Sequence, residues 1–404
     1  MVVLLSSLLS LFSCTLFEQQ YCQSHSDCQD SFGVNAICST EGYCSSCESN
    51  TECVDAFGNG SVCSAAAIPT ESSWIFEENY CIDLQPTDRC NTSIPSDIWN
   101  NWDQYENAYI VGQLFDANAD QEKIVGAQIA LDMVRERESL DGREFVQIFC
   151  NYENDSLNQW DGLREEEAVK AATKYLVEDI GAKIIIGPAG SDDVLAAYTE
   201  SNDRAVFISP SATASTLTSL DGLSNSDENP GLLWRTVGSD EVQGEVLGNM
   251  LIRDGGPKIA LIYQESLYGE GIFNLAAEKL TQAGIFYQPL AYSDFLEENI
   301  SEFLQDDFSG ISFISSDSND IIAFIDIMLE RHESRVFPPS RIFLTDAAAR
   351  QTVLGGFQLD FTIYPEFTES IRGTRPSLPA SGEDSLFQGF DAEFKAVYGS
   401  SASE

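Results

Sequence analysis

The segment GAKIIIGPAGS (181–191) decides the fold. Its residues 183–187 form a short apolar run of strand length. A helical pattern at 164–179 precedes this run, and another at 191–201 follows it. A buried strand between two helices is typical of a parallel sheet that carries helices on both faces. The segment therefore predicts an α/β fold.

The same alternation of strands and helices extends in both directions from this segment. On the amino-terminal side and just beyond it, the pattern predicts strands at 109–115, 143–150, 205–209 and 232–237, and a helix at 121–137. A second series predicts strands at 258–263, 285–292, 311–316 and 341–346, and helices at 240–253, 267–283 and 318–332. Two series predict two similar lobes, with a crossover near Val237–Asp240. A cleft between them would lie at the carboxyl ends of strands, where α/β proteins bind ligands.

The composition excludes several classes of function. The chain has 404 residues, with 65 Asp and Glu against 21 Lys and Arg, for a net charge of −44. This excess of acid repels phosphate, so we expect no nucleic-acid partner and no binding to an anionic membrane surface through charge. A hydrophobic content of 43% is still sufficient for large cores.

Catalytic motifs are also scarce. His25 lies in a Cys-rich stretch and His332 in a charged helical run, and there is no third histidine. Most Ser–His and Cys–His catalysis and most His-containing zinc sites are thereby excluded. The chain has neither a P-loop nor a G-x-S-x-G motif. Carboxylate-only enzymes are not excluded by these absences, but we expect no enzyme, no cofactor and no metal site.

The amino terminus is apolar over residues 1–13, far shorter than the ~20 residues of a membrane-spanning helix. It resembles a bacterial lipoprotein signal, in which a Leu stands three positions before a Cys. Leu11 and Ser13 fit this pattern before Cys14, whereas Phe12 is large and the first basic residue is Arg89. We expect residues 1–14 to be a signal and Cys14 to be a lipid anchor of an exported, periplasmic or cell-surface protein. An ordinary secretory signal with an incidental cysteine is the alternative.

The other ten cysteines form an even set, which in an exported chain indicates disulfides. Eight of them make two similar repeats, CQDSFGVNAIC (28–38) and CVDAFGNGSVC (53–63) with their flanking cysteines. The repeats resemble small Dickkopf-like Cys-rich knots. Spacing leaves the connectivity open; our hypothesis pairs first with third and second with fourth in each repeat, and Cys90 with Cys150. The expected disulfide cysteines are Cys22, Cys28, Cys38, Cys44, Cys47, Cys53, Cys63, Cys81, Cys90 and Cys150. Zinc is the disfavoured alternative, because there is one C-x2-C pair where a ribbon needs two.

Four motifs carry a resemblance over residues 108–404: GAKIIIGPAGS (181–191), VFISPSATASTLT (206–218), LLWRTVGSDEVQGEVL (232–247) and KIALIYQESLYGEGIFNLAAEKL (258–280). Together they resemble the type I periplasmic solute-binding proteins of the branched-chain amino-acid binding family. The resemblance implies lobes at about 108–238 and 239–370 and a return segment at 371–404. The cysteine pattern places a Cys-rich region at 15–90 before them, and we expect a linker at 91–107. The resemblance also implies capture of an amino acid or similar small polar molecule for an ABC permease in the membrane.

The resemblance assigns site residues one by one. Ser191 would bind the ligand's α-carboxylate at the start of a helix, where free N–H groups and the helix dipole favour an anion. Ser211 would offer its carbonyl to the ammonium, and Thr213 its hydroxyl and N–H to the carboxylate. Tyr268 would close over the ligand, and Asp346 would bind the ammonium. The structural alternatives are a helix cap at Ser191, a Ser/Thr turn at Ser211 and Thr213, and a packed Tyr268.

Two further positions concern the ligand's side chain and the end of the chain. Asp317 would enter the cleft where the family often has an aromatic residue, and the family's aromatic lid falls near Ala119. In the family, a segment like FDAEFKAVYG (390–399) precedes another helical stretch, so we expect the chain to be truncated at its carboxyl end. A surface sensor with the Cys-rich repeats as its partner-binding module is the alternative function. A carboxylate-dependent enzyme using Asp346 and Asp317 has little support.

Overall fold

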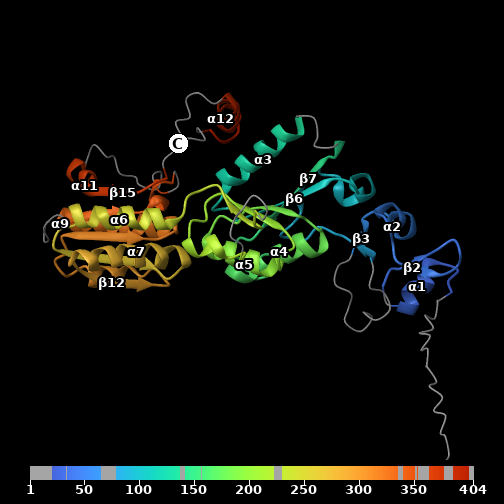
Figure 1. Ribbon diagram of the computed structural model, residues 1–404, viewed down its shortest axis with the longest axis horizontal. Helices are drawn as coiled ribbons and strands as arrows, with labels where there is room; N and C mark the ends of the chain where they lie inside the picture. Colours follow the sequence, from blue (N-terminus) through green and yellow to red (C-terminus); the bar gives the residue numbers. More distant parts are fainter. Residues whose placement is uncertain are drawn as a thin grey trace, which may run out of the picture. The chain divides into compact units, whose positions relative to one another are not determined.

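Figure 1 shows the computed structural model of the chain. The structure describes residues 21–32, 34–64, 79–136, 142–155, 157–222, 230–334, 340–350, 353, 364–376 and 385–399. The predicted signal segment and Cys14 lie outside the described residues. The chain forms two compact units: the first extends to Gln85 and includes Asp97–Glu106, and the second comprises Pro86–Ser96 and everything from Asn107 onward.

The first unit repeats one small motif, a helix followed by two antiparallel strands. The first copy is α1 (His25–Phe32), β1 (Ile37–Cys38) and β2 (Cys44–Ser45). The second copy is α2 (Asn50–Phe57), β3 (Ser61–Ser64) and β4 (Tyr80–Asp83). The 3-10 helices η1 (Ile98–Asn100) and η2 (Trp102–Tyr105) add a buried, edge-on pair of rings from Trp99 and Trp102.

Disulfides lie in both hydrophobic clusters of this unit. They are Cys22–Cys38, Cys28–Cys44, Cys47–Cys63 and Cys53–Cys81, that is, first with third and second with fourth in each repeat. A region this small buries too little apolar surface to fold without such cross-links. The described cysteines of the repeats are all oxidised, so none offers a thiolate to zinc. His25 has a structural contact here, because its Nδ1 accepts a hydrogen bond from the Cys38 N–H at 2.9 Å.

The first lobe of the second unit is built on a six-stranded sheet in the order β10-β9-β8-β6-β7-β5. Its strands are β5 (Thr92–Ile94), β6 (Tyr109–Phe115), β7 (Phe145–Asn151), β8 (Ile184–Ile186), β9 (Val206–Ser209) and β10 (Leu233–Arg235). All neighbours are parallel except β5, which runs antiparallel to β7. The helices are α3 (Gln121–Glu136), α4 (Glu165–Lys174) with its π-helical continuation η4 (Tyr175–Asp179), α5 (Ser191–Ser201) and the 3-10 helix η5 (Ser215–Ser219).

Residues 91–107, for which we expect a linker, hold regular structure instead. They contain β5 of the sheet and the two 3-10 helices of the first unit. The disulfide Cys90–Cys150 joins the residue before this stretch to β7, and β5 pairs with that same strand. β5 has only three residues, too few for a periodic pattern in the sequence to distinguish a strand from a loop.

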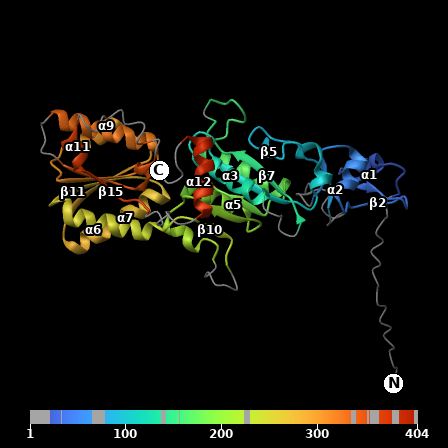
Figure 2. The same cartoon turned by 90° about the horizontal axis from the view of Figure 1, so that it is seen from above.

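The second lobe has a five-stranded, fully parallel sheet in the order β12-β11-β13-β14-β15. Its strands are β11 (Lys258–Gln264), β12 (Phe286–Tyr292), β13 (Gly310–Ile314), β14 (Arg341–Leu344) and β15 (Ile371–Gly373). Its helices are α6 (Asp240–Asp254), α7 (Leu267–Ala283), α8 (Glu297–Phe303), α9 (Ser318–Ser334), the 3-10 helix η6 (Asp346–Ala349) and α11 (Pro365–Ser370). Figure 2 shows α6 and α7 on one face of this sheet and α9 and α11 on the other.

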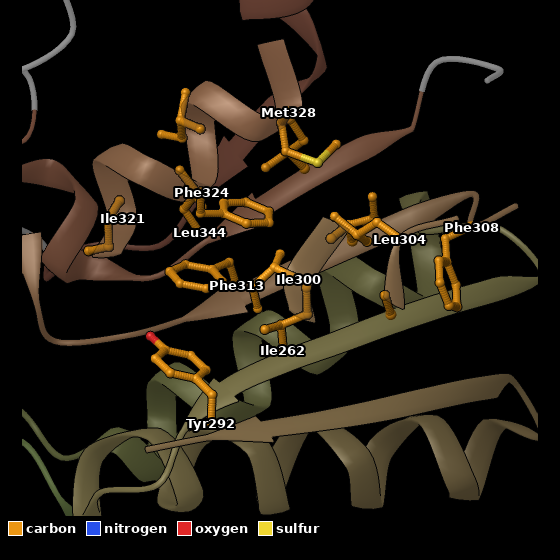
Figure 3. Packing of buried hydrophobic residues seen from close by; sticks show 14 of the residues in the cluster. Ile262, Tyr292, Ile300, Leu304, Phe308, Phe313, Ile321, Phe324, Met328 and Leu344 are labelled. Carbon is orange, nitrogen blue, oxygen red and sulfur yellow. The ribbon is translucent and has the colours of Figure 1, made fainter. Parts of the chain in front are cut away.

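Alternate residues of the central strands pack on opposite faces of this sheet. Ile259 and Leu261 of β11 face a cluster with α6 and α7, whereas Ala260 and Ile262 face a cluster with α8 and α9. In the second cluster the rings of Phe313 and Phe324 stack at 4.3 Å (Figure 3). Burial on both faces explains why these strands read as continuous apolar runs.

After β15 the chain returns to the first lobe as α12 (Ser385–Tyr398), which packs on α3. Gly126 of α3 lies at this contact, where an added Cβ would be at an ordinary van der Waals distance, 3.7 Å, from the rings of both Phe390 and Phe394. The predicted α/β architecture of two doubly wound parallel sheets is confirmed. Over the described part of the chain, no helix is both long and apolar enough to cross a bilayer.

Candidate functional site

The start of α5 presents uncapped backbone N–H groups beside a buried hydroxyl. Gly187 follows β8 with φ +100°, and a Cβ there would lie 2.1 Å from the Leu114 carbonyl, so only glycine fits. The extended Gly190 is the N-cap and offers no side chain to the helix. Ser191 is therefore the first helical residue rather than the cap, and it is buried. Helix N–H groups left without a side-chain acceptor form an anion-binding position.

Hydroxyl groups join this loop to the loop after β9. Ser209 Oγ donates to the Pro188 carbonyl at 2.6 Å and accepts from the Ala212 N–H at 3.1 Å. Ser211 Oγ donates to the Ala189 carbonyl at 3.0 Å. Ser191 Oγ accepts from the Ala214 N–H at 3.2 Å, which leaves its own proton free to be donated. The hydroxyls thus fix the two loops that carry Ser191 and Thr213 against each other.

Thr213 is buried and its backbone is held by the segment that leaves the first lobe. Its carbonyl accepts from the Asp240 N–H at 2.9 Å and from Arg235 Nη1 at 3.1 Å. Arg235 also donates to the Ala214 carbonyl at 3.0 Å. Thr213 therefore lies where β10 gives way to α6, the crossover expected near Val237–Asp240.

In the second lobe, Tyr268 and Asp346 meet directly. Tyr268 is buried in the first turn of α7 and donates to Asp346 Oδ1 at 2.5 Å. Burial, reinforced by the Asp346 carboxylate, raises the pKa of Tyr268 well above its usual value, so the phenol remains a donor. Gln243 Nε2 donates to the same Asp346 oxygen at 2.8 Å and to Thr374 Oγ1 at 2.9 Å.

Asp240 is a fully buried carboxylate that sequence reasoning did not assign to the site. Neither of its oxygens has a hydrogen-bond partner of good geometry among the described residues. Burial raises the pKa of Asp240 to about 7, and the nearby Asp346 adds to the rise, whereas Thr213 and Arg235 act in the opposite direction. Asp240 thus lies near both Thr213 and Asp346. An unpaired buried carboxylate is costly, and a cationic group would neutralise it.

Asp317 is placed differently from the other predicted residues. It is exposed, and its Oδ1 accepts from the N–H groups of Asn319 at 2.7 Å and Asp320 at 3.2 Å at the start of α9. This is a helix-capping arrangement. No described contact joins Asp317 to Ser191, Thr213 or Tyr268.

Carboxylates also gather at the edge of the first lobe, after β6 and β7. Asp116 Oδ1 accepts from the N–H of Ala119 at 2.8 Å, which places the exposed Ala119 in an Asp-centred turn. The Tyr152 hydroxyl lies 3.4 Å from Asp120 Oδ2. Burial, followed by the charge of Asp120, raises the pKa of Asp193 in the first turn of α5 to about 7. The surroundings of the α5 amino terminus are therefore strongly acidic.

The two lobes of the second unit also touch beside Ser191. Both carboxylate oxygens of Asp192 lie 3.2 Å from the Leu267 N–H at the start of α7. The Leu267 side chain packs against Val194, Ala212 and Leu217 of the first lobe. The loop bearing Ser191 and the helix bearing Tyr268 are therefore adjacent.

No family model matches the chain, but sequence comparison finds a relative over part of its length. The leucine-, isoleucine-, valine-, threonine- and alanine-binding protein of Pseudomonas aeruginosa is 28% identical over 162 residues. The match covers 40% of this chain and 38% of that protein, so well under two thirds of the relative's length is spanned.

Solved structures resemble the chain over a larger part of its length. The branched-chain amino-acid substrate-binding protein LivJ of Streptococcus pneumoniae, in complex with isoleucine, aligns with a TM-score of 0.54 at 17% identity. That alignment covers 73% of this chain and 78% of LivJ. A solute-binding protein of an ABC transporter from R. palustris, in complex with benzoate, aligns with a TM-score of 0.53 at 15% identity, covering 73% and 75%. The second unit thus has the type I periplasmic-binding-protein fold, shared with the branched-chain amino-acid binding proteins.

Proposed function

We propose that the chain is an extracytoplasmic solute-binding protein that captures an amino acid, or a similar small polar molecule, for an ABC permease. One observation carries the proposal: the buried Asp240, whose oxygens have no hydrogen-bond partner of good geometry among the described residues, lies near both Thr213 of the first lobe and Asp346 of the second. Carboxylates at this position suit a ligand ammonium. The start of α5 has no side-chain cap, and Ser191 there is hydrogen-bonded to the loop that carries Thr213. Its free N–H groups suit a ligand carboxylate.

The head-group contacts follow from these chemistries. The ligand carboxylate would meet the N–H groups of α5 and the hydroxyls of Ser191 and Thr213. The ammonium would meet Asp346, Asp240 and the Ser211 carbonyl. Tyr268, already bonded to Asp346, would close the second lobe over the ligand. Asp317 remains a prediction for the side-chain end, apart from the head-group clamp.

The ligands of similar proteins support this class of ligand for the chain, but they do not identify which molecule it binds. The Pseudomonas aeruginosa protein is named for five amino acids, and the Streptococcus pneumoniae structure holds isoleucine. The R. palustris structure holds benzoate, which shares only the carboxylate with an amino acid. The carboxylate half of the proposed clamp is therefore its best-supported part.

Export and anchoring complete the proposal. Five disulfides are stable in an oxidising compartment outside the cytoplasm. We propose Cys14 as the lipid anchor and the disulfide-bonded first unit as the part nearest to it in sequence. Mass spectrometry of the native amino terminus tests the anchor, and an unmodified Cys14 would contradict it.

Thermal unfolding against the twenty amino acids tests the function. An amino acid at 100 times its dissociation constant adds about 2.7 kcal/mol of stability, a readily measured shift. We expect Ser191→Ala and Asp346→Asn to remove the shift, while Thr199→Ala, an exposed change on the same helix α5, retains it. A folded wild-type protein that responds to no amino acid would refute the head-group assignment.

A surface sensor is the second candidate, favoured by the disulfide-rich first unit. Such a rigid exported module is a common kind of partner-binding domain. The two functions differ in what binding does. A transport protein supports uptake of labelled amino acid into cells and loses it with Asp346→Asn, whereas a sensor changes signalling with uptake unaltered.

A further inference from the structure

The first turn of α6 contacts both halves of the candidate clamp. At its start, the Asp240 N–H binds the Thr213 carbonyl of the first lobe at 2.9 Å. Three residues later, the Gln243 amide binds Asp346 of the second lobe at 2.8 Å. The clamp residues of the two lobes are therefore joined through residues 240–243, one turn of a single helix.

Gln243 also reaches the second crossover of the chain. Its Nε2 donates to Thr374 Oγ1 at 2.9 Å as well as to Asp346 Oδ1. Thr374 follows β15 directly, and its N–H still binds the Leu344 carbonyl at 3.2 Å. From there the chain leaves the second lobe and re-enters the first as α12. An amide nitrogen has two hydrogens, and Gln243 uses one on the clamp and one on the crossover.

α6 cannot easily move to accommodate a change at Gln243. A Cβ on Gly244 would lie 2.6 Å from Leu275 Cβ, and one on Gly248 would lie 2.8 Å from Lys279 Cβ, so α6 and α7 are in very close contact. The same helix α7 carries Tyr268, the other donor to Asp346 Oδ1. Asp346 is therefore held between two donors on one rigid pair of helices.

We propose that Gln243 is a positioning residue that couples the Asp346 carboxylate to the crossover at Thr374. The inference rests on the proposed function, in which Asp346 receives the ligand's ammonium. With Thr374 bound, the Gln243 amide has one orientation and holds Asp346 ready for the ligand. When the ligand reorients Asp346, the change is transmitted through Gln243 to Thr374. Thr374 lies at the crossover, about which the lobes would move relative to each other.

Thr374→Val gives the decisive variant, because it removes one hydroxyl, keeps the side chain's shape and leaves the Gln243–Asp346 bond in place. The probe is the amino acid that shifts the unfolding of the wild-type full chain most in the panel of twenty, with affinity measured by calorimetry. We expect Thr374→Val to weaken binding about threefold to tenfold and Gln243→Ala about tenfold or more. The double variant should bind no more weakly than Gln243→Ala alone, because the crossover contact is already lost.

Matched controls separate coupling from general loosening. Asn249→Ala is an exposed change on α6, and Thr281→Val removes a hydroxyl that bonds only within α7. Both should bind like the wild type, and the ligand-free unfolding temperature of Thr374→Val should match that of Thr281→Val. Wild-type affinity in Thr374→Val, or effects that multiply in the double variant, would overturn the inference and leave the proposed function standing. A wild-type protein that binds no amino acid would overturn both.

Discussion

The phenol of Tyr268 donates a 2.5 Å hydrogen bond to Asp346 Oδ1, although 78 residues separate the two in the chain. The sheet explains the approach. β11 and β14 both pair with β13 in parallel, so the loops that follow them open at the same edge. Tyr268 lies in the first turn of α7, which follows β11, and Asp346 lies just after β14. Parallel topology thus assembles this half of the candidate site.

Loss of the Tyr268 hydroxyl should weaken both the fold and ligand binding. Tyr268→Phe leaves a half-buried carboxylate with one fewer donor, and a hydrogen bond to a charged group contributes about 1.5–3 kcal/mol. We expect an unfolding free energy lower by about that amount in urea, and about tenfold weaker amino-acid binding. Tyr263→Phe is the matched control, since that ring stacks on Phe273 at 4.0 Å in the same core. Equal losses in the two variants would contradict a specific role for the Tyr268–Asp346 bond.

Asp240 should make stability fall as the pH rises. Its pKa is about 7 in the folded chain, against the ordinary value of 3.8 for an unburied aspartate. Between about pH 4 and 7, Asp240 is protonated in the folded state and ionised in the unfolded state. The free energy of unfolding therefore falls as the pH rises through this range, and the loss is complete above pH 7. At about 1.36 kcal/mol per pKa unit, the three-unit shift sets an upper limit of about 4 kcal/mol.

The Asp240→Asn variant lacks this titration, so its stability advantage over the wild type should grow from pH 5 to pH 8. Urea unfolding of ligand-free protein across that range measures the difference. Glu241→Gln, an exposed change in the same turn, should follow the wild type at every pH. An Asp240→Asn curve parallel to the wild type would mean that Asp240 is ionised at pH 5 and that its burial is compensated.

Much of the second unit could be predicted from its sequence, because strongly punctuated elements leave clear local signals. The ranges predicted for the strand at 109–115 and the helices at 191–201 and 267–283 coincide with β6, α5 and α7. β15 has three residues and α11 six, too few for a periodic pattern, so neither was foreseen.

The candidate site, too, could be predicted from the sequence only where a local motif marks the residue. Motifs could point to Ser191, Tyr268 and Asp346, but Asp240 and Gln243 were missed. An acid in the first turn of a helix is ordinarily read as a favourable charge near the dipole. The Gln243 contacts join residues 103 and 131 positions apart, and nothing local signals such pairs. For Asp317, sequence could not distinguish a ligand contact from the helix cap that the structure contains.

The disulfide between Cys90 and Cys150 should stabilise the second unit more than any cross-link in the repeats. It closes a segment of sequence separation 60, and the loop-entropy relation gives about 4 kcal/mol for that length. We expect the double variant Cys90→Ala/Cys150→Ala to lower the urea midpoint of the second unit, followed through the fluorescence of Trp160 and Trp234. Cys53→Ala/Cys81→Ala, which opens a bridge of the first unit, is the control and should leave that midpoint unaltered. A similar loss in both would show that the two units unfold together.

Arg89, next to that disulfide, is buried and donates hydrogen bonds to one carboxylate and three backbone carbonyls. Its guanidinium binds the Asp161 carboxylate in two places, Nε to Oδ2 at 2.6 Å and Nη2 to Oδ1 at 2.7 Å. The remaining donors bind the carbonyls of Asn151, Glu153 and Leu163 at 3.0–3.2 Å. The Arg89 side chain is 4% exposed and the Asp161 side chain 34%, so the guanidinium is shielded from solvent and the carboxylate only in part. The arrangement holds the long loop after β7 against the start of the second unit.

A lysine cannot reproduce this geometry, because its ammonium is a point charge with three donors instead of a planar fork with five. We expect Arg89→Lys to be destabilising, and Arg89→Ala to cost about 1.5–3 kcal/mol, since the carbonyls lose their donors while water can solvate the partly exposed Asp161. Arg143→Lys is the control, because that exposed guanidinium only stacks over Tyr109 at 5.1 Å and should change stability by less than about 0.5 kcal/mol. Urea unfolding measures all three. If Arg89→Lys were as stable as the wild type, the forked contacts would not be what fixes the loop, and charge alone would suffice.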